Sequence, residues 1–494
     1  MELKLRNKIT FIIISLAIFL RLFYLSQKSF WCDEFLAISL SRIPSFYDMV
    51  YWIIKYDAHP PLFYLIIRIV FQFTQSEFGL RFIPFLFGAG AVIIFYRLLR
   101  ELNIKNYLLP LSLFAFSPPA VLWSQIVKSY STLTFFSLLS LLMLIRYKKT
   151  EKVIYTIFWI ISSIFMLYLH NYGVLIIAGQ IIVLWLYRKV VPLKKFSIPF
   201  LVIFLLYLPY FAGPLFSQIR FVKTAPHSVV NPFFRLGYTF FYFIFGETLS
   251  PLNFKFVIPG LLLFLVFFIR GICVKKNFFQ NFSVIVLALG IIVIFSVKAT
   301  IPQNLIHLQP FFFILVASGV ESIKKEKVKI IFSFLLVLNL IPSLWYYYQE
   351  DSLQYHDVSK LIPYKEIIDT IKKEEKRGEV VIINENRETR FVEFFKPYSP
   401  WDWYYKGKLP IIEITTNLEL EKIYNKYTGF WLILRYTSLE YQWNEDIKNF
   451  FIKQKSVKIK EMKLIKNYSF LDVLRGKGKK EYYFLEIYHF VKEL

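Results

Sequence analysis

The stretch "ITFIIISLAIFLRLFYL", residues 9–25, approaches the roughly 20 apolar residues that an α-helix needs to cross a bilayer. Similar runs, such as "VIPGLLLFLVFFI" at residues 257–269, recur up to about residue 348. The chain of 494 residues is 56% hydrophobic and 20% aromatic, which is more apolar than a soluble protein of this length requires. Because backbone polar groups in lipid must pair within their own segment, the pattern predicts a polytopic α-helical membrane protein.

Lysine and arginine are concentrated in short breaks between the apolar runs, within a chain whose formal net charge is +25. The breaks read "KLRNK", "RLLRELNIK", "RYKKTEK", "YRKVVPLKK" and "ESIKKEKVK". Cytoplasmic loops of membrane proteins carry such an excess of basic residues. The charge pattern therefore predicts the orientation of the chain in a plasma or inner membrane, and it argues against a nucleic-acid partner.

Placing every basic break in the cytoplasm gives eleven spans, a cytoplasmic N-terminus and an extracytoplasmic C-terminal part. The first apolar run follows a basic start, as in a signal peptide, but no cleavage pattern follows it, so we interpret it as a span. The predicted spans cover about residues 9–26, 79–100, 107–123, 131–146, 153–169, 172–187, 196–211, a run that starts after residue 253, 282–298, 308–322 and 329–348.

One apolar segment must not cross the membrane in this topology. "PLFYLIIRIVFQF", residues 61–73, is short, follows two prolines and carries Arg68. We predict that it forms a helix in the outer interface or dips in and out of it. The scheme also places Cys32 and Cys273 on opposite sides of the membrane, so no disulfide bond between them is expected.

The composition changes after residue 348. "DVSKLIPYKEIIDTIKKEEKRGE" combines charges with apolar residues at helical spacing. "VVIIN", "PIIEIT", "FWLILRY" and "YYFLEIY" are typical of strands. We therefore predict a membrane domain over residues 1–348 and a soluble extracytoplasmic α/β domain over residues 349–494.

Polar residues that this topology places outside, close to the bilayer, come from separate loops. Ionisable groups at a membrane rim are costly and often functional. Each also has a structural interpretation: Asp33 caps a helix, His59 closes a turn, Arg81 or His170 sits in the interface, and Lys128 reaches lipid phosphates. The prediction of a site depends on the whole set, which comprises Asp33, Glu34, Asp57, His59, Arg81, Gln125, Lys128, Tyr130, His170, Asn171, Tyr172, Gln303, Asn304 and His307.

A carboxylate beside several cations suits a phosphorylated lipid substrate. The carboxylate can take the proton from an acceptor hydroxyl, and the cations can stabilise a leaving phosphate. Successive helical residues point about 100° apart, so Asp33 and Glu34 cannot both face one site; one is expected to act and the other to orient or cap. The sequence contains no P-loop, G-x-S-x-G elbow, H-E-x-x-H or paired C-x-x-C motif, and its spans lack the charged midplane residues of a transporter.

Three N-terminal segments, "FWCDEFLAISLS", "HPPLFYLIIRIV" and "LRFIPFLFGAGAVIIFYRLLREL", are found in this order. Together they resemble the start of the GT-C glycosyltransferases, in particular family 39, which includes protein O-mannosyltransferases and bacterial aminoarabinose lipid A transferases. "FSPPAVLWSQIVKSYSTL", "LHNYG" and "LQPFFFILVASG" are similar to later segments of that family, so the resemblance covers about residues 10–322. It implies a GT-C fold with about 11 transmembrane helices, external juxtamembrane helices and a soluble C-terminal domain.

The resemblance also implies that a sugar is transferred, with inversion, from a polyprenyl-phosphate donor to an external acceptor. It implies that Asp33 is the catalytic aspartate with Glu34 as its neighbour, and that His59 occupies the family's H-P-P position. Where the family often has an acidic residue and then an arginine, this chain has Ile126 and Lys128. We therefore expect Lys128 to contact the donor phosphate, and we assign no cofactor; a divalent metal stays an open question.

The leading hypothesis is a hexosyl- or pentosyltransferase of the cell envelope, with a polyprenyl-phosphate-sugar donor, membrane lipids around it and a lipid, glycan or protein acceptor. Its predicted catalytic residues are Asp33 and Glu34. Its predicted substrate-binding residues are His59, Arg81, Gln125, Lys128, Tyr130, His170, Asn171, Tyr172, Asn304 and His307. The alternative is a lipid-linked substrate flippase or transporter with an external domain, and a structural or receptor-like membrane protein is a third class.

Overall fold

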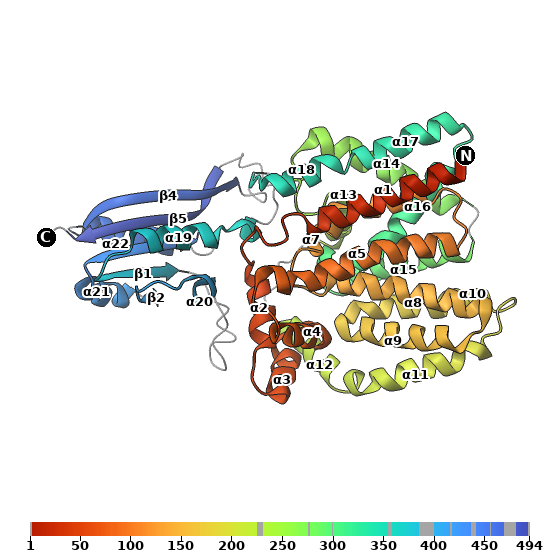
Figure 1. Ribbon diagram of the computed structural model, residues 1–494, viewed down its shortest axis with the longest axis horizontal. Coiled ribbons are helices and arrows are strands. Elements are labelled where there is room, and N and C mark those ends of the chain that lie inside the picture. The colour runs from red at the N-terminus through yellow and green to blue at the C-terminus, as the bar shows by residue number, and fades with distance from the viewer. Residues whose placement is uncertain are drawn as a thin grey trace. The chain divides into compact units, whose positions relative to one another are not determined.

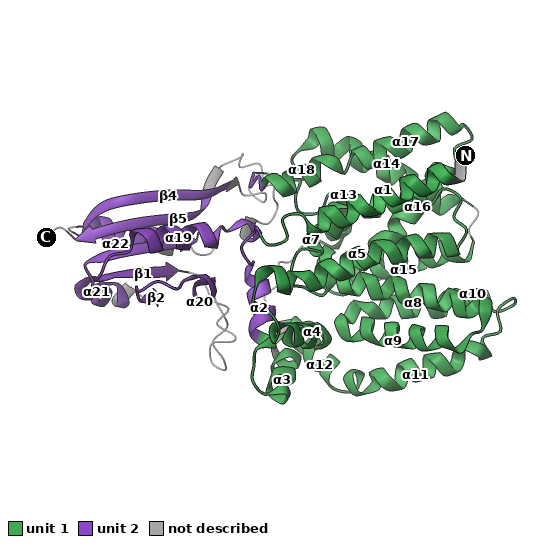
Figure 2. Ribbon diagram, viewed as in Figure 1, with its two compact units in different colours: residues 1–26, 40–349 green, residues 27–39, 350–494 purple. Residues whose placement is uncertain are grey.

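The computed structural model describes residues 2–224, 231–274, 277–298, 300–353, 358–384, 400–414, 417–435, 441–454, 456–468 and 481–492. The chain forms two compact units (Figure 2). The helical unit comprises residues 1–26 and 40–349, and the α/β unit comprises residues 27–39 and 350–494. The short segment 27–39 thus groups with the C-terminal residues, although the chain on either side of it belongs to the helical unit.

The helical unit contains a helix, or a pair of helices, for each of the eleven predicted spans, and the predicted fold class is confirmed (Figure 1). Its long helices are α1 (Glu2–Leu22), α5 (Glu77–Glu101), α8 (Tyr130–Thr150), α9 (Val153–Leu169), α10 (Val174–Leu186), α11 (Lys194–Phe211), α14 (Phe254–Cys273), α15 (Phe278–Ser296), α16 (Gln309–Glu321), α17 (Glu326–Leu338) and α18 (Ile341–Gln349). Among the described residues, seven segments are long and apolar enough to cross a membrane, and three further apolar helices are shorter.

The third predicted span is broken into two helices. Helix α6 (Leu108–Ala115) ends before Ser117, and α7 (Pro118–Trp123) begins directly after it. Two consecutive prolines lack the N–H groups that would continue α6, whereas proline is well tolerated in the first turn of a new helix. Ser117 caps that turn, because its hydroxyl accepts a hydrogen bond from the Ala120 N–H at 3.4 Å.

Short helices surround one end of α9 and α11. Helix α4 (Leu62–Phe71) confirms the helix predicted over residues 61–73, and α3 (Phe46–Tyr56) precedes it. Arg68 of α4 donates hydrogen bonds to the carbonyl groups of Ile43 and Pro44, which explains an arginine in an apolar segment. Helices α12 (Pro214–Thr224) and α13 (Pro232–Phe245) follow α11, and Figure 1 shows α3, α4 and α12 gathered together.

Glycines permit a close crossing of helices α14 and α16. A Cβ atom added to Gly271 of α14 would lie 1.8 Å from the carbonyl oxygen of Leu315 in α16. The same addition at Gly319 of α16 would lie 1.9 Å from the carbonyl oxygen of Phe267 in α14. The two backbones approach each other so closely that any side chain at either position would push the helices apart, as at other small-residue crossings in membranes.

The α/β unit is built on a five-stranded mixed sheet with the order β2–β1–β3–β5–β4. Strand β1 (Glu379–Asn384) is parallel to β2 (Ile411–Glu413) and β3 (Gly429–Arg435), whereas β5 (Glu481–Lys492) is antiparallel to β3 and β4 (Ser456–Tyr468). Four of these strands were predicted from the sequence, except that Thr415 and Tyr436, at the ends of two predicted strands, lie outside the described residues. Strand β4 was not predicted, because its lysines interrupt the apolar pattern at this sheet edge.

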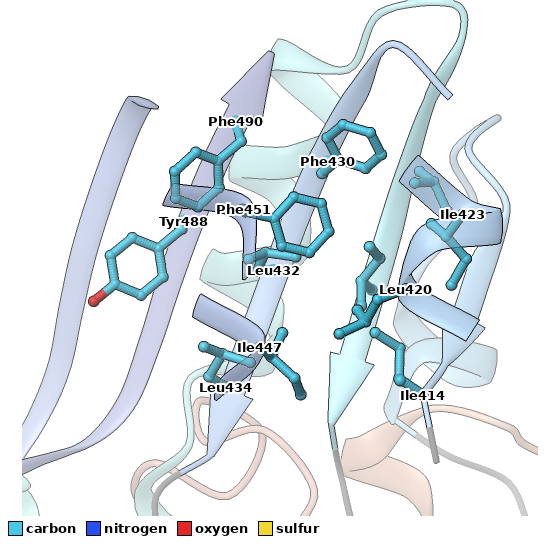
Figure 3. Packing of buried hydrophobic residues seen from close by; sticks show 12 residues of the cluster. Ile414, Leu420, Ile423, Phe430, Leu432, Leu434, Ile447, Phe451, Tyr488 and Phe490 are labelled. Carbon is cyan, nitrogen blue, oxygen red and sulfur yellow. The ribbon is translucent and has the colours of Figure 1, made fainter. Parts of the chain in front are cut away.

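Helices cover the sheet. One apolar cluster packs α21 (Asn417–Lys426) and α22 (Tyr441–Lys453) against β1, β3 and β5 (Figure 3). In that view Leu420 and Ile423 come from α21, and Ile447 and Phe451 from α22. The unit also contains η3 (Val358–Leu361), α19 (Tyr364–Glu374), α20 (Pro400–Tyr404) and, in its N-terminal segment, the start of α2 (Cys32–Ser41).

Candidate functional site

Asp33 and Glu34 lie in the first turn of α2, within the α/β unit. The Glu34 carboxylate accepts a hydrogen bond from the Trp31 N–H at 2.9 Å, and the Glu34 N–H donates to the Trp31 carbonyl group at 2.9 Å. Glu34 is therefore buried and used to cap its own helix. Asp33 is half-buried, and its Oδ1 lies 3.9 Å from Cys32 Sγ. From the sequence we expected one of the two carboxylates to orient or cap the helix, and the Glu34 carboxylate caps it.

Asp57 and His59 form a tight turn in the helical unit, between α3 and α4. Asp57 Oδ1 accepts from the His59 N–H at 2.8 Å and lies 2.7 Å from His59 Nδ1. Its second oxygen accepts from the Tyr64 hydroxyl at 2.9 Å. Burial alone would raise the pKa of Asp57, but His59, Lys128 and the Tyr64 hydroxyl together hold that pKa well below its usual range. Asp57 is thus a carboxylate that stays ionised while it is buried.

Aromatic and imidazole rings from three chain segments meet beside this turn. The ring centroids of His59 and His170 are 5.0 Å apart, and those of Tyr130 and His170 are 5.8 Å apart. The rings of His170 and Tyr172 are 5.4 Å apart. Burial lowers the pKa of His170 well below its usual value, and the neighbouring imidazoles of His59 and His307 lower it further. His170 is therefore a neutral imidazole at physiological pH.

The hydroxyl groups of Tyr130 and Tyr172 extend this arrangement to the segment before α16. Tyr130 donates a hydrogen bond to Asn304 Oδ1 at 3.3 Å, and the hydroxyl groups of Tyr172 and Thr300 are 2.8 Å apart. His307, in the short helix η2 (Pro302–Leu308), is completely buried. No group in the described part of the chain has hydrogen-bond geometry with either ring nitrogen of His307 or with Nε2 of His170.

We call these residues the polar cluster. Its members are buried or half-buried and come from four stretches of the helical unit; they are Asp57, His59, Tyr64, Lys128, Tyr130, His170, Asn171, Tyr172, Asn304 and His307. Lys128 is only 6% exposed, in the loop between α7 and α8. Its charge acts on Asp57. The cluster therefore combines a buried cation, a buried carboxylate and several hydrogen-bonding rings.

Tyr64, Tyr210 and Gln218 belong to this network but were not predicted from the sequence. Asn171 Nδ2 donates to the Ala58 carbonyl group at 3.0 Å and to Gln218 Oε1 at 3.1 Å. Gln218 Nε2 donates to the His59 carbonyl group at 2.6 Å, and the Tyr210 hydroxyl donates to both Gln218 and Asn171. The sequence signal for Gln218 is a single glutamine beside apolar residues in "PLFSQIRF", which indicates a buried polar contact.

Gln125 and Arg81 were predicted to bind substrate, and in the structure both donate hydrogen bonds to main-chain carbonyl groups. Gln125 Nε2 donates to the carbonyl groups of Leu20, Arg21 and Phe23 at 2.7–3.0 Å. Arg81 Nη1 donates to the Leu25 carbonyl group at 3.3 Å. These contacts hold the end of α1 and lie apart from the hydrogen bonds and ring contacts that define the polar cluster.

The sequence did not decide whether the site binds a divalent metal ion. Within the described ranges, no three or more His, Cys, Asp or Glu side chains lie close enough together to hold a metal ion. The acid that the family often carries in the second external loop is Ile126 here, and Lys128 puts a positive charge next to Asp57. The described residues of this region therefore do not fit a metal ion.

Comparison with known proteins places this arrangement in a fold class. The model of the family described as dolichyl-phosphate-mannose-protein mannosyltransferase matches residues 58–216, which is less than half of the chain. No curated protein matches the sequence. The crystal structure of ArnT from Cupriavidus metallidurans in the apo state is similar over 97% of both chains, with a TM-score of 0.57 and 9% identity.

A second solved structure is the oligosaccharyltransferase AglB from Archaeoglobus fulgidus, in complex with an inhibitory peptide and a dolichol-phosphate. It matches 97% of this chain and 74% of its own, with a TM-score of 0.50 and 11% identity. Both proteins have the GT-C fold, and this chain therefore has it as well, as its sequence motifs predicted. The chain is a multi-pass membrane protein of that fold.

Proposed function

We propose that this protein is a glycosyltransferase that moves a sugar from a polyprenyl-phosphate donor to an acceptor hydroxyl on the extracytoplasmic face, with inversion. The observation that carries the proposal is the polar cluster, because a GT-C fold supplies the scaffold and the cluster supplies a buried cation with hydrogen-bonding rings between helix ends. The acceptor class is a lipid, a glycan or a protein. The named binding partners of the similar structures, a dolichol-phosphate and a peptide in AglB, support a lipid donor and an external acceptor.

The proposed reaction forms one bond and breaks another at the anomeric carbon. The acceptor oxygen attacks that carbon, the bond from the carbon to the phosphate oxygen breaks, and polyprenyl phosphate leaves with the bonding electrons. Asp33 takes the acceptor proton as general base. Glu34, whose carboxylate holds the Trp31 N–H, keeps the first turn of the helix in place so that Asp33 is presented to the acceptor.

Lys128 is the proposed partner of the donor phosphate. It is buried, and its position next to Asp57 keeps one anion beside it when no phosphate is bound. His59 contacts Asp57, and His170 and Tyr130 pack on His59. As negative charge grows on the leaving phosphate, a fixed cation and preoriented donors stabilise it more than water would.

The decisive experiment measures release of free polyprenyl phosphate by purified protein in detergent with a panel of polyprenyl-phosphate sugars, with and without a membrane extract that supplies acceptors. We expect release by the wild type with one donor, loss of at least about 100-fold in Asp33→Asn, and a similar loss in Lys128→Met. The matched control is Asp48→Asn, an exposed carboxylate in the first turn of α3.

The outcomes separate the alternatives. Equal release by wild type and Asp33→Asn would keep the enzyme and remove Asp33 from its chemistry. No release with any donor, with or without extract, would refute the proposed transferase and favour transport of the lipid-linked substrate.

A further inference from the structure

Within the α/β unit, C-terminal residues contact the segment 27–39, which carries Asp33. Two backbone groups and one side chain of residues 27–30 form hydrogen bonds with residues that follow more than 330 positions later in the sequence. The Phe30 N–H donates to the Tyr404 hydroxyl at 2.8 Å, and Ser29 Oγ accepts from the Lys365 N–H at 3.1 Å. Lys365 Nζ also donates to the Gln27 carbonyl group at 3.4 Å.

Aromatic packing adds to these hydrogen bonds. The rings of Phe30 and Phe35 lie 5.5 Å and 6.3 Å from the ring of Trp403, and Phe35 lies 6.1 Å from Tyr404. Lys360 Nζ sits over the Trp31 ring, 4.2 Å from its centroid. Phe30 and Phe35 are at most 2% exposed. Because Phe30 and Phe35 flank Asp33 in the chain, the contacts fix the start of α2 on both sides of that carboxylate.

Further hydrogen bonds hold the surface that contacts α2. Helix α20, which carries Trp403 and Tyr404, is anchored through its neighbour Tyr405. The Tyr405 hydroxyl donates to Glu375 Oε2 at 2.7 Å and accepts from the Leu409 N–H at 2.9 Å. Glu375 follows α19 directly, so α20 is tied to a helix whose buried isoleucines belong to the core of the unit.

We propose that Trp403 and Tyr404 are positioning residues, which set the orientation of α2 and thereby of the Asp33 carboxylate. This inference rests on the proposed function of Asp33 as a base. It assigns a role to the C-terminal residues of the α/β unit: they hold the helical turn that carries Asp33. A catalytic group misplaced by about 1 Å can lose about 100-fold in rate, so loosening α2 should lower kcat without weakening donor binding.

The test begins with a measurement that is independent of activity. Cys32 precedes Asp33, and both cysteines of the chain are exposed, so a Cys273→Ser background leaves Cys32 as the single site for a spin label. In full-length protein in detergent, we expect a restricted spectrum for this label. The Trp403→Ala/Tyr404→Ala variant should give a clearly more mobile spectrum. Tyr483→Ala, which removes an exposed ring of the same unit from β5, is the matched control and should leave the spectrum unchanged.

The second measurement uses unlabelled protein and compares kcat with KM for the donor. We expect kcat to fall at least about 10-fold in the double alanine variant, with an unchanged KM, and to recover in Trp403→Phe, which retains an aromatic ring. An unchanged label spectrum would overturn the proposed anchoring. A mobile label with wild-type kcat, or a rise in KM alone, would overturn the positioning role. If wild type releases no polyprenyl phosphate, the proposed function fails while the anchoring is still decided by the spectra.

Discussion

Two groups of buried polar side chains in the helical unit differ in what they contact. In the polar cluster, polar side chains contact one another, as Asp57 does with His59 and Tyr64, and several also contact the nearby main chain, as Asn171 does at Ala58. Around the end of α1, polar side chains donate mainly to main-chain carbonyl groups. Arg21 donates to the carbonyl groups of Ala17, Phe114 and Ala115, and Gln125 donates to those of Leu20, Arg21 and Phe23. We call this second group the carbonyl clasp; its other members are Tyr347 and Tyr348, whose hydroxyls donate to Gln125 and to the Leu20 carbonyl group.

This difference distinguishes polar groups that the fold requires from polar groups that it does not require. Carbonyl groups at helix ends lack intrahelical partners, and in an apolar environment each requires a donor. The carbonyl clasp meets that requirement where α1 and α6 end, so its polarity is explained by the fold. The polar cluster is not explained in this way, because within the described residues the ring nitrogens of His307 have no partner with hydrogen-bond geometry. Under the proposed function, polar groups that the fold does not use are available to a substrate.

The largest effect is expected from Arg21, the buried centre of the carbonyl clasp. Arg21→Met leaves the carbonyl groups of Phe114 and Ala115 without this donor, at about 1–3 kcal/mol for each unsatisfied group. We expect a marked fall in the temperature at which the protein aggregates in detergent, measured as the monodisperse fraction after heating. Arg100→Met, an exposed arginine on α5, is the matched control. A variant as stable as this control would show that the clasp does not hold the ends of α1 and α6.

In the polar cluster, the corresponding change is expected to spare the fold and reduce activity. Asp57→Asn removes the charge that orients His59 and faces Lys128, so kcat/KM for polyprenyl phosphate release should fall by about 100-fold. Thermal stability should change much less than in Arg21→Met. The comparison with Asp48→Asn measures the same substitution on the exposed face of α3. A loss of stability without a loss of activity would move Asp57 into the structural group.

The pH dependence of thermal stability should show that His170 is buried as a neutral imidazole. The pKa of His170 is lowered in the folded protein. As the pH falls below about 6.5, the unfolded chain therefore binds a proton at this histidine before the folded chain does. The free energy of unfolding then decreases by up to about 1.4 kcal/mol per pH unit. Asp57, whose pKa is also lowered, contributes stability that is lost only below its ordinary pKa of about 4. Thermal aggregation measured between pH 7 and pH 5 should therefore show a decline that is shallower in His170→Asn. Parallel curves would contradict a neutral, buried His170.

The smallest effect is expected from Tyr210, at the edge of the polar cluster. Tyr210→Phe removes the hydroxyl that holds Gln218 and Asn171, at about 1 kcal/mol. Because Gln218 in turn donates to the His59 carbonyl group, activity should fall only a few-fold. The exposed Tyr47→Phe provides the control for initial rates. A 100-fold loss would mean that Tyr210 touches the substrate.

The sequence predicted the fold and most of the polar cluster, for identifiable reasons. Apolar runs and basic breaks are local signals, so they located each span, and motifs such as "HPPLFY" and "LHNYG" placed His59 and His170 at helix ends. The contacts of Gln125 could not be predicted, because a glutamine beside a membrane looks the same whether it faces a substrate or a carbonyl group. Strand β4 was not predicted because lysines stand between its apolar residues. The grouping of residues 27–39 with the C-terminal unit was also hidden, since it depends on contacts far apart in sequence.

The hydrogen bond between Phe30 and Tyr404 has a consequence for biosynthesis, because its two residues are 374 positions apart. At about 5–20 residues per second, a ribosome needs roughly 20–75 s to make the chain between them. During that time α1 has already emerged, and the segment that carries Asp33 waits without the partner that holds it. An enzyme assembled in this order is completed only when its last unit folds, so truncated chains that reach the membrane should be inactive even when every span is present.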